Sequence, residues 1–150
     1  MLRLIIMTVV AFVLAFMVTS HVARGANFEP LTRDEPIVRM VLQEAIHEPF
    51  AGLVAVAGVA FDRMQDRRWP STDRKVVYQR AQFTGMGIRL RRYSQAQITR
   101  ARRAVAGASF GFRPCGTVLW YHTHKVKPSW RKRYQLVCRL GTHLFYGDVK

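Results

Sequence analysis

The sequence predicts a single α+β domain that is mainly helical, contains a small sheet and follows an N-terminal hydrophobic helix. Three observations support this fold class. The 150 residues suffice for one hydrophobic core. Apolar residues recur with helical spacing over three long segments, residues 37–47, 51–64 and 94–108. Only the short segment 117–122 alternates in the manner of a strand.

The N-terminal residues predict export. The apolar stretch Leu4–Val18 follows Arg3 and precedes small residues around Ala23 and Gly25, where a signal peptidase could cut. The stretch is shorter than the roughly 20 residues that span a bilayer. Residues 4–23 could nevertheless form an uncleaved anchor. We therefore assign residues 1–26 to a signal peptide or signal-anchor, 27–36 to a linker and 37–150 to the folded domain.

The three long helices follow from their apolar pattern. The helix over 37–47 must end before Pro49, because the residue before a proline is pushed out of the helical region. The helix over 51–64 is apolar on nearly all sides and should be the buried centre of the domain. The helix over 94–108 is amphipathic, with its arginines facing outward.

The intervening segments predict shorter elements. Ser71 or Thr72 should cap a short helix that continues to about Arg80. Residues 81–87 contain two glycines and indicate a turn or a short strand. Another short element should begin at Pro128. The sheet is therefore expected to be a minor part of the domain.

Charge is distributed unevenly along the chain. The formal net charge is +15, and residues 76–150 hold 15 Lys and Arg against one acid, Asp148. Residues 1–75 hold 9 against 8. So basic a half favours an anionic partner, which could be peptidoglycan with its peptide carboxylates, lipopolysaccharide, anionic lipid or nucleic acid. The charge alone does not select among them.

Glu44 and Glu48 are four residues apart and so share one helix face. Two carboxyls can form a glycosidase pair when they lie about 5 Å or about 6.5–9.5 Å apart. Glu44 directly precedes the apolar helix, and burial against it would favour the protonated form that an acid catalyst needs. Glu48 adjoins Pro49 and is expected to hold backbone amides or an arginine instead.

Cysteines and histidines allow further hypotheses. Cys115 and Cys138 could form one disulfide in an exported protein or remain two buried thiols. His122, His124 and His143 could bind zinc as in an amidase, with Glu44 as the base. The neighbouring Lys125 and Lys127 would repel a cation, so the favoured hypothesis contains no metal and no cofactor.

The segment from Glu44 to Arg63 resembles the core motif of the SleB/CwlJ-type cell wall hydrolases. That motif opens with Glu-Ala-x-x-Glu-Pro-x-x-Gly, continues through Ala-Val-Ala and ends in Asn-Arg, where this chain has Asp62-Arg63. Five further stretches resemble the family in the same order. They are Trp69-Pro70-Ser71 with Val76-Val77, Gln82-Phe83-Thr84, residues 101–107, Leu119–His122 with Pro128-Ser129-Trp130, and Gly141–Tyr146.

The resemblance implies a lysozyme-like catalytic domain that cleaves peptidoglycan by lytic transglycosylation. The family's catalytic Glu falls on Glu44. Its groove-lining positions fall on Gln82, Tyr121, His143 and Tyr146. Two residues depart from the family pattern. His47 replaces a small residue, and Asp62 replaces Asn, adding a charge that could raise the Glu44 pKa or act, like Glu48, as a second carboxylate.

Together these features predict a monomeric cell wall hydrolase that acts on peptidoglycan glycan strands. It would be exported to the periplasm or cell wall, or tethered to the inner membrane through residues 1–23 with its catalytic domain outside the cytoplasm. A bacteriophage endolysin that lyses its host, or a wall-remodelling enzyme, fits this size and charge. No nucleic acid is expected as partner. The alternatives are the zinc amidase and a non-catalytic basic protein that binds membrane or nucleic acid.

Overall fold

The computed structural model describes residues 35–83 and 93–149. The predicted N-terminal hydrophobic helix, the linker up to residue 34 and the end of the 81–87 segment lie outside the described residues. Within the described ranges, no helix combines the length and the apolar character that crossing a bilayer requires.

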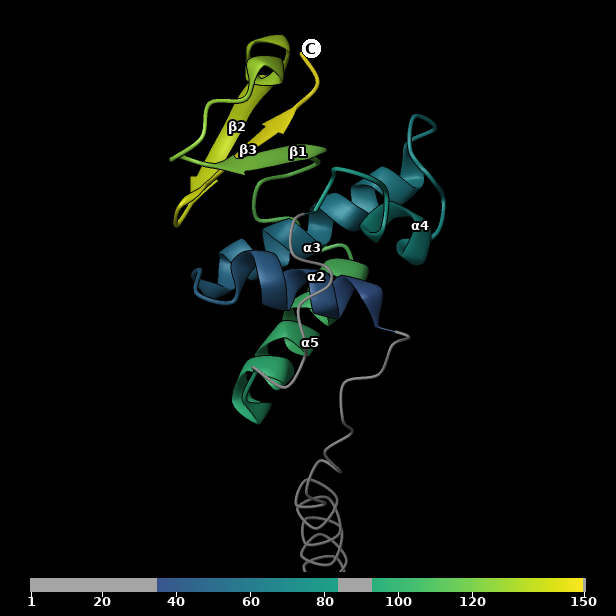
Figure 1. Cartoon of the computed structure of the whole chain (residues 1–150), viewed down its shortest axis with the longest axis vertical. Coiled ribbons are helices and arrows are strands. Elements are labelled where there is room, and N and C mark those ends of the chain that lie inside the picture. The colour runs from purple at the N-terminus through teal and green to yellow at the C-terminus, as the bar shows by residue number, and fades with distance from the viewer. Residues whose placement is uncertain (1–34, 84–92, 150) are drawn as a thin grey trace, which may run out of the picture. The chain divides into compact units, whose positions relative to one another are not determined.

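Three helices form the core of the domain. They are α2 (Pro36–Ala45), α3 (Phe50–Gln65) and α5 (Gln95–Ser109), and each packs against the other two. The short α4 (Asp73–Val77) packs against α2 and α3. Most of α3 is buried, as its apolar sequence predicts, so it forms the centre of the core. Figure 1 shows these helices together, with the sheet lying above them.

The helix ends follow local rules in two cases. α2 begins at Pro36, whose fixed φ and missing N–H suit the first helical position. α5 begins after Ser94, which forms a reciprocal capping box with Gln97. α4 is different. It starts after Thr72 without a side-chain cap and ends at Val77, so the expected continuation to Arg80 is wrong.

The sheet contains three antiparallel strands in the order β1-β3-β2. They are β1 (Trp120–Thr123), β2 (Gln135–Leu140) and β3 (His143–Gly147), and the 3-10 helix η2 (Ser129–Arg133) precedes β2. Strand β1 begins three residues later than the expected segment 117–122 and ends at Thr123. Strands β2 and β3 form a hairpin across Gly141 and Thr142, and Gly141 supplies the positive φ of 58° that such a tight turn needs.

The strand register assigns the site candidates to two faces of the sheet. Tyr121 lies opposite Phe145, and Thr123 lies opposite His143. Because side chains alternate along a strand, Tyr121, His143 and Phe145 share one face. His122 and Tyr146 belong to the other face by the same rule.

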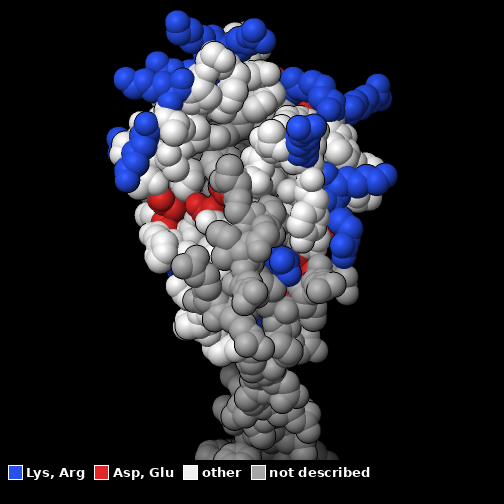
Figure 2. Space-filling view, in the orientation of Figure 1, with Lys and Arg blue, Asp and Glu red and all other residues white. Residues whose placement is uncertain are grey.

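Basic side chains cover the sheet end of the view in Figure 2, which has the orientation of Figure 1. The segment from the end of β1 through β2 contributes exposed Lys125, Lys127, Lys132, Arg133 and Arg139. The positive charge predicted for the second half of the chain therefore lies in part on its solvent-exposed surface.

Candidate active site

Glu44 and Tyr121 lie close enough together for the charge of Glu44 to act on Tyr121. Glu44 occupies the last turn of α2, and Tyr121 projects from β1. Burial raises the pKa of Tyr121 well above its ordinary value, and the negative charge of Glu44 raises it further, whereas Arg63 acts in the opposite direction. Tyr121 therefore keeps its proton at physiological pH. Glu44 is near enough to act on the Tyr121 pKa, but the buried Tyr121 hydroxyl has no partner within hydrogen-bond geometry among the described residues.

Glu48 connects the helices to the β2–β3 hairpin. The Thr142 backbone N–H donates to Glu48 Oε2 at 2.8 Å, and the Thr142 hydroxyl donates to Oε1. His143 Nδ1 lies 3.5 Å from Oε1. Burial alone would raise the pKa of Glu48, but the Thr142 hydrogen bonds and the nearby histidines outweigh it and lower the pKa below 4.5. Glu48 is thus held as a carboxylate and is unsuited to donate a proton near neutral pH.

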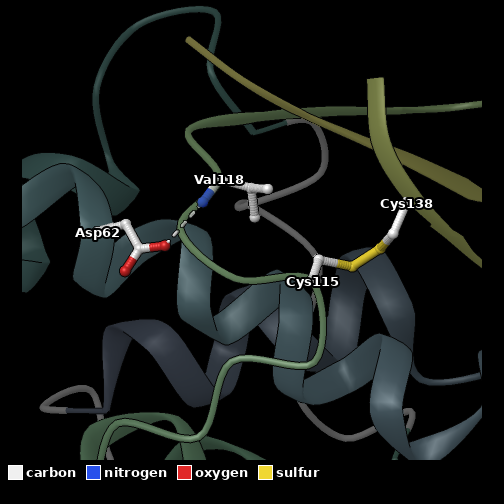
Figure 3. The surroundings of a disulfide bond; sticks show 4 residues. All are labelled: Asp62, Cys115, Val118 and Cys138. Carbon is white, nitrogen blue, oxygen red and sulfur yellow. Dashed lines mark hydrogen bonds between the residues drawn. A yellow bond between two sulfur atoms is a disulfide. The ribbon is translucent and has the colours of Figure 1, made fainter. Parts of the chain in front are cut away.

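Asp62 is buried, and both of its oxygens have partners. Oδ1 accepts from Arg113 Nε at 2.7 Å, and Oδ2 accepts from the Val118 backbone N–H at 3.0 Å. Figure 3 shows the second contact, which joins α3 to the loop before β1. Gly58, one helical turn earlier, makes room for Arg113, because a Cβ there would lie 3.2 Å from the Arg113 side chain. Asp62 therefore positions the loop that leads into β1.

Arg63 holds the next residue of the same loop. Its Nε donates to the Leu119 carbonyl at 2.8 Å. Asp62 and Arg63 therefore bind the backbone of two consecutive residues directly before β1, Val118 and Leu119. The guanidinium also stacks on the Trp69 ring at 4.0 Å. Burial lowers the pKa of Arg63 to about 10, and Arg63 remains charged at neutral pH. Sequence analysis assigned no function to this arginine or to Trp69.

The two cysteines form a disulfide, Cys115–Cys138, with a Cα separation of 5.7 Å. It tethers the loop before β1 to strand β2, as Figure 3 shows. The pairing that the sequence left open is present in the structure. Together with Asp62 and Arg63, it fixes the approach of the chain to β1.

A cavity of about 320 Å³ opens beside Tyr121 at the edge strand β1. Arg63, Trp69, Gln82 and Tyr121 contribute to its lining. The rest of the lining is largely aromatic and consists of Ala81, Trp120, Trp130 and Tyr134. Tyr121 thus lies between this cavity and Glu44, and Gln82 lines the same cavity.

A larger cavity of about 540 Å³ lies at the start of α2. Its lining is mostly apolar and comes from α2, α3, α5 and residues 71–73 at the start of α4, and it includes both members of the Arg102–Glu35 ion pair. It includes none of the residues that the sequence singled out as site candidates. We therefore place the candidate active site at the smaller, more polar cavity.

The remaining site candidates occupy different environments. His143 is buried, with its ring in edge contact with Tyr121 at 5.2 Å between centroids, so it belongs to the Glu44 region. Burial lowers the pKa of His143 despite the neighbouring Glu48. Tyr146 is buried on the opposite face, where its hydroxyl lies 2.9 Å from His122 Nε2. The structure therefore does not bring Tyr146 together with Glu44 and Tyr121.

The histidines do not converge. The register places His122 and His143 on opposite faces of the sheet, and both His122 nitrogens already have polar neighbours, Thr123 O and the Tyr146 hydroxyl. Exposed His124 lies against the Thr142 carbonyl. Among the described residues, no three metal-binding side chains are grouped in a way that could hold an ion. The geometry does not favour the zinc amidase alternative.

Comparison with known proteins gives consistent matches. The sequence profile of the Cell Wall Hydrolase family matches residues 47–146. This range begins three residues after Glu44 and contains all the other site candidates. The spore cortex-lytic enzyme of Oceanobacillus iheyensis is 31% identical over 111 residues. That alignment covers 70% of this chain but 38% of the relative, so the chain spans less than half of the curated protein.

Two solved structures share the fold. The catalytic domain of the Bacillus cereus SleB protein has a TM-score of 0.63 and 24% identity, and the match covers 83% of this chain and 100% of that domain. The catalytic domain of the germination-specific lytic transglycosylase SleB from Bacillus anthracis has the same TM-score with 26% identity, covering 79% and 100%. The domain therefore has the SleB catalytic fold, with its helices and small sheet.

Proposed function

Because the chain belongs to the Cell Wall Hydrolase family, we propose that it cleaves the glycosidic bond between N-acetylmuramic acid and N-acetylglucosamine in peptidoglycan. Glu44 serves as both general acid and general base. The observation that carries this proposal is the position of Glu44 beside the Tyr121 hydroxyl, next to an aromatic cavity. The solved structure described as a lytic transglycosylase supports the reaction class.

The reaction needs one carboxyl group. Protonated Glu44 donates its proton to the glycosidic oxygen as the bond from that oxygen to the anomeric carbon breaks. The resulting carboxylate then takes the proton of the muramic 6-hydroxyl, whose oxygen bonds to the anomeric carbon and closes a 1,6-anhydro ring. Glu44 ends protonated and ready for another turnover. Tyr121, whose buried hydroxyl has no partner within hydrogen-bond geometry among the described residues, would approach Glu44 and donate a hydrogen bond during the carboxylate stage.

The other two carboxylates are poorly placed for this chemistry. Glu48 is held as a carboxylate by Thr142, and both oxygens of Asp62 accept hydrogen bonds, from Arg113 and from the Val118 backbone N–H. A second catalytic carboxylate would have to give up these bonds on every turnover. This favours the single-carboxylate reaction over a two-carboxylate hydrolase.

The experiment compares Glu44→Gln with Glu48→Gln. Glutamine is nearly isosteric but exchanges no proton at working pH. Glu44→Gln should therefore lower turnover of purified peptidoglycan by about 10²–10⁴-fold and leave binding intact. Glu48→Gln is the matched control and should lose stability before it loses turnover. Clearing by Glu44→Gln at the parental rate would refute the assignment.

Mass spectrometry of the products identifies the bond and the attacking group. A transglycosylase releases anhydro-muramic ends, which are lighter by one water than the reducing ends that a hydrolase produces. Products cleaved only between glycan and peptide would indicate an amidase and overturn the proposal.

The cellular location follows from the N-terminal sequence. Residues 1–26 would direct export, and cleaved or tethered forms would both place the domain outside the cytoplasm, as in an endolysin or a remodelling enzyme. Deleting these residues should leave the protein in the cytoplasm, where it does not lyse the producing cell. Lysis by the truncated chain without a helper would contradict this assignment.

A further inference from the structure

The aromatic cavity beside β1 collects all three tryptophans of the chain, Trp69, Trp120 and Trp130. Trp120 stacks on Tyr134 at 3.5 Å between centroids, and Trp130 meets Tyr134 edge-on at 6.1 Å. Trp69 meets Trp120 edge-on at 6.5 Å. An aromatic wall with a few polar groups is the usual lining of a small-molecule site, and about 320 Å³ is near the lower end of the size range for such sites. The cavity fits about one sugar residue.

Arg63 places a buried positive charge at this cavity. The residue is 4% exposed, and its Nε donates a hydrogen bond to the Leu119 carbonyl. Its Nη1 is buried and has no hydrogen-bond partner, and no carboxylate of the described residues forms an ion pair with it. A buried charge without a counter-ion is unfavourable unless a ligand supplies one.

The neighbouring Asp62–Arg113 pair contrasts with Arg63. Asp62 directly precedes Arg63 in α3, but its charge is matched by Arg113 at 2.7 Å. The two adjacent residues therefore differ, because Asp62 has its counter-ion within the protein and Arg63 does not.

A second donor lies at the same cavity. Trp69 Nε1 is also buried and lacks an acceptor among the described residues. Indole N–H groups only donate, and so does guanidinium. Since the Arg63 guanidinium stacks on the Trp69 ring at 4.0 Å, the two donors belong to one cluster. A carboxylate, with two acceptor oxygens and a negative charge, is the group that matches a guanidinium together with a neutral N–H.

We propose that this cavity binds the free lactyl carboxylate of an N-acetylmuramic acid residue, with Arg63 and Trp69 donating to its oxygens and the aromatic wall holding the sugar ring. The choice of saccharide rests on the proposed function. In intact peptidoglycan this carboxyl is bound in an amide to the stem peptide. The preferred substrate is therefore glycan from which the peptide has been removed, so a hydrolysis of that amide must come first.

The test uses the full chain in mild detergent and follows its tryptophan fluorescence, because every tryptophan lines the cavity. The probes are N-acetylmuramic acid, its methyl ester and N-acetylglucosamine. The ester keeps the lactyl ether but has no charge, and N-acetylglucosamine lacks the whole group. The acid should bind at least about tenfold more tightly than either neutral sugar.

Two variants examine the donors. Trp69→Phe keeps an aromatic ring and removes the N–H, and Arg63→Lys keeps the charge but loses the planar fork. In both variants, the ratio of the affinity for the acid to the affinity for the ester should fall towards one. Arg102→Lys is the control, since Arg102 is a partly buried arginine whose partner is Glu35 and which does not line this cavity. It should keep the parental ratio. If Arg63→Lys fails to fold, as circular dichroism would show, Trp69→Phe still tests the carboxylate site.

Equal binding of acid and ester by the parent would overturn the carboxylate site. The same preparation is assayed on peptide-free and on intact glycan, which separates the two proposals. Cleavage without discrimination between acid and ester refutes the carboxylate site and leaves the proposed function standing. Discrimination without cleavage of either glycan supports the site and refutes the proposed function.

Discussion

Replacing Asp62 by Asn tests whether this carboxylate holds the loop before β1 or takes part in catalysis. Asp62 is 6% exposed and accepts hydrogen bonds from Arg113 Nε and the Val118 N–H. An amide keeps one acceptor oxygen, but it is neutral and its nitrogen cannot accept. The variant therefore loses one hydrogen bond between charged groups. Such bonds contribute about 1.5–3 kcal/mol, which for a domain of this size lowers the melting temperature by roughly 5–12 °C.

The assay combines urea unfolding with turnover well below the melting temperature. Asp62→Asn should lower the free energy of unfolding by about that amount, because Arg113 loses its counter-ion, and should retain most of its turnover. The matched control is Asp148→Asn, whose carboxylate is 53% exposed and paired with Arg68. An exposed pair should contribute no more than about 1 kcal/mol. If Asp62→Asn kept its stability but lost turnover as fully as Glu44→Gln, the positioning role would be wrong.

Three further predictions concern the disulfide, pH and salt. Replacing Cys115 and Cys138 together by Ser should lower the free energy of unfolding by about 3 kcal/mol, measured in urea, and a change near zero would contradict a native disulfide. The free energy of unfolding should fall as pH drops, first below about 6.5 and again below about 4.5, because His143 and Glu48 have lower pKa values in the folded than in the unfolded chain and the unfolded chain binds more protons. In a series of urea midpoints, Glu48→Gln should remove the lower step and keep or enlarge the upper one, because Glu48 raises the His143 pKa, and an unchanged profile would refute the assignment. Binding to purified envelope material should weaken from low to moderate salt, because screening limits the range of interactions between exposed charges to about 8 Å at physiological ionic strength. Salt-independent binding would show that the basic surface is not involved.

The helices were the most predictable part of the fold. The apolar run alone indicated α3 to within one residue at each end, because a helix buried on all sides needs no other signal. α5 was equally clear, since Ser94 and Gln97 form the capping box that starts it. α4 ends earlier than expected, and the nearby Ala81 adopts a positive φ of 61° that could not be predicted from an alanine.

The β2–β3 hairpin escaped sequence analysis for a physical reason. A bulge between Leu136 and Cys138 shifts the register, so Leu136 and Val137 are both exposed and the alternation that marks a strand is lost. The turn at Gly141 and Thr142 was the available signal. The same turn accounts for the position of Glu48, whose carboxylate accepts a hydrogen bond from the Thr142 backbone N–H.

The grouping of the candidate site residues could not be predicted from the sequence. Sequence resemblance selected both Tyr121 and Tyr146, yet their relation depends on strand register. Tyr121 faces His143 and the helices, and Tyr146 faces the other way. The sequence resemblance includes Arg63 only as part of the Asp62-Arg63 motif and implies no role for it. Only the structure shows that it is buried and stacked on Trp69.

The charges around Tyr121 also bear on how a single carboxylate can work. Arg63 and Glu44 both act on the Tyr121 pKa, in opposite directions, so a cation and an acid share one neighbourhood. No ion pair joins Arg63 to a carboxylate in the described part of the chain. If Arg63 were paired directly with Glu44, it would hold that carboxyl ionised and prevent it from donating a proton. Arg63 instead donates a hydrogen bond to Leu119 and stacks on Trp69, so its charge stays near the site without forming an ion pair with Glu44. A ligand carboxylate on Arg63 would then neutralise the cation during binding, and Glu44 could carry the proton that the leaving oxygen requires.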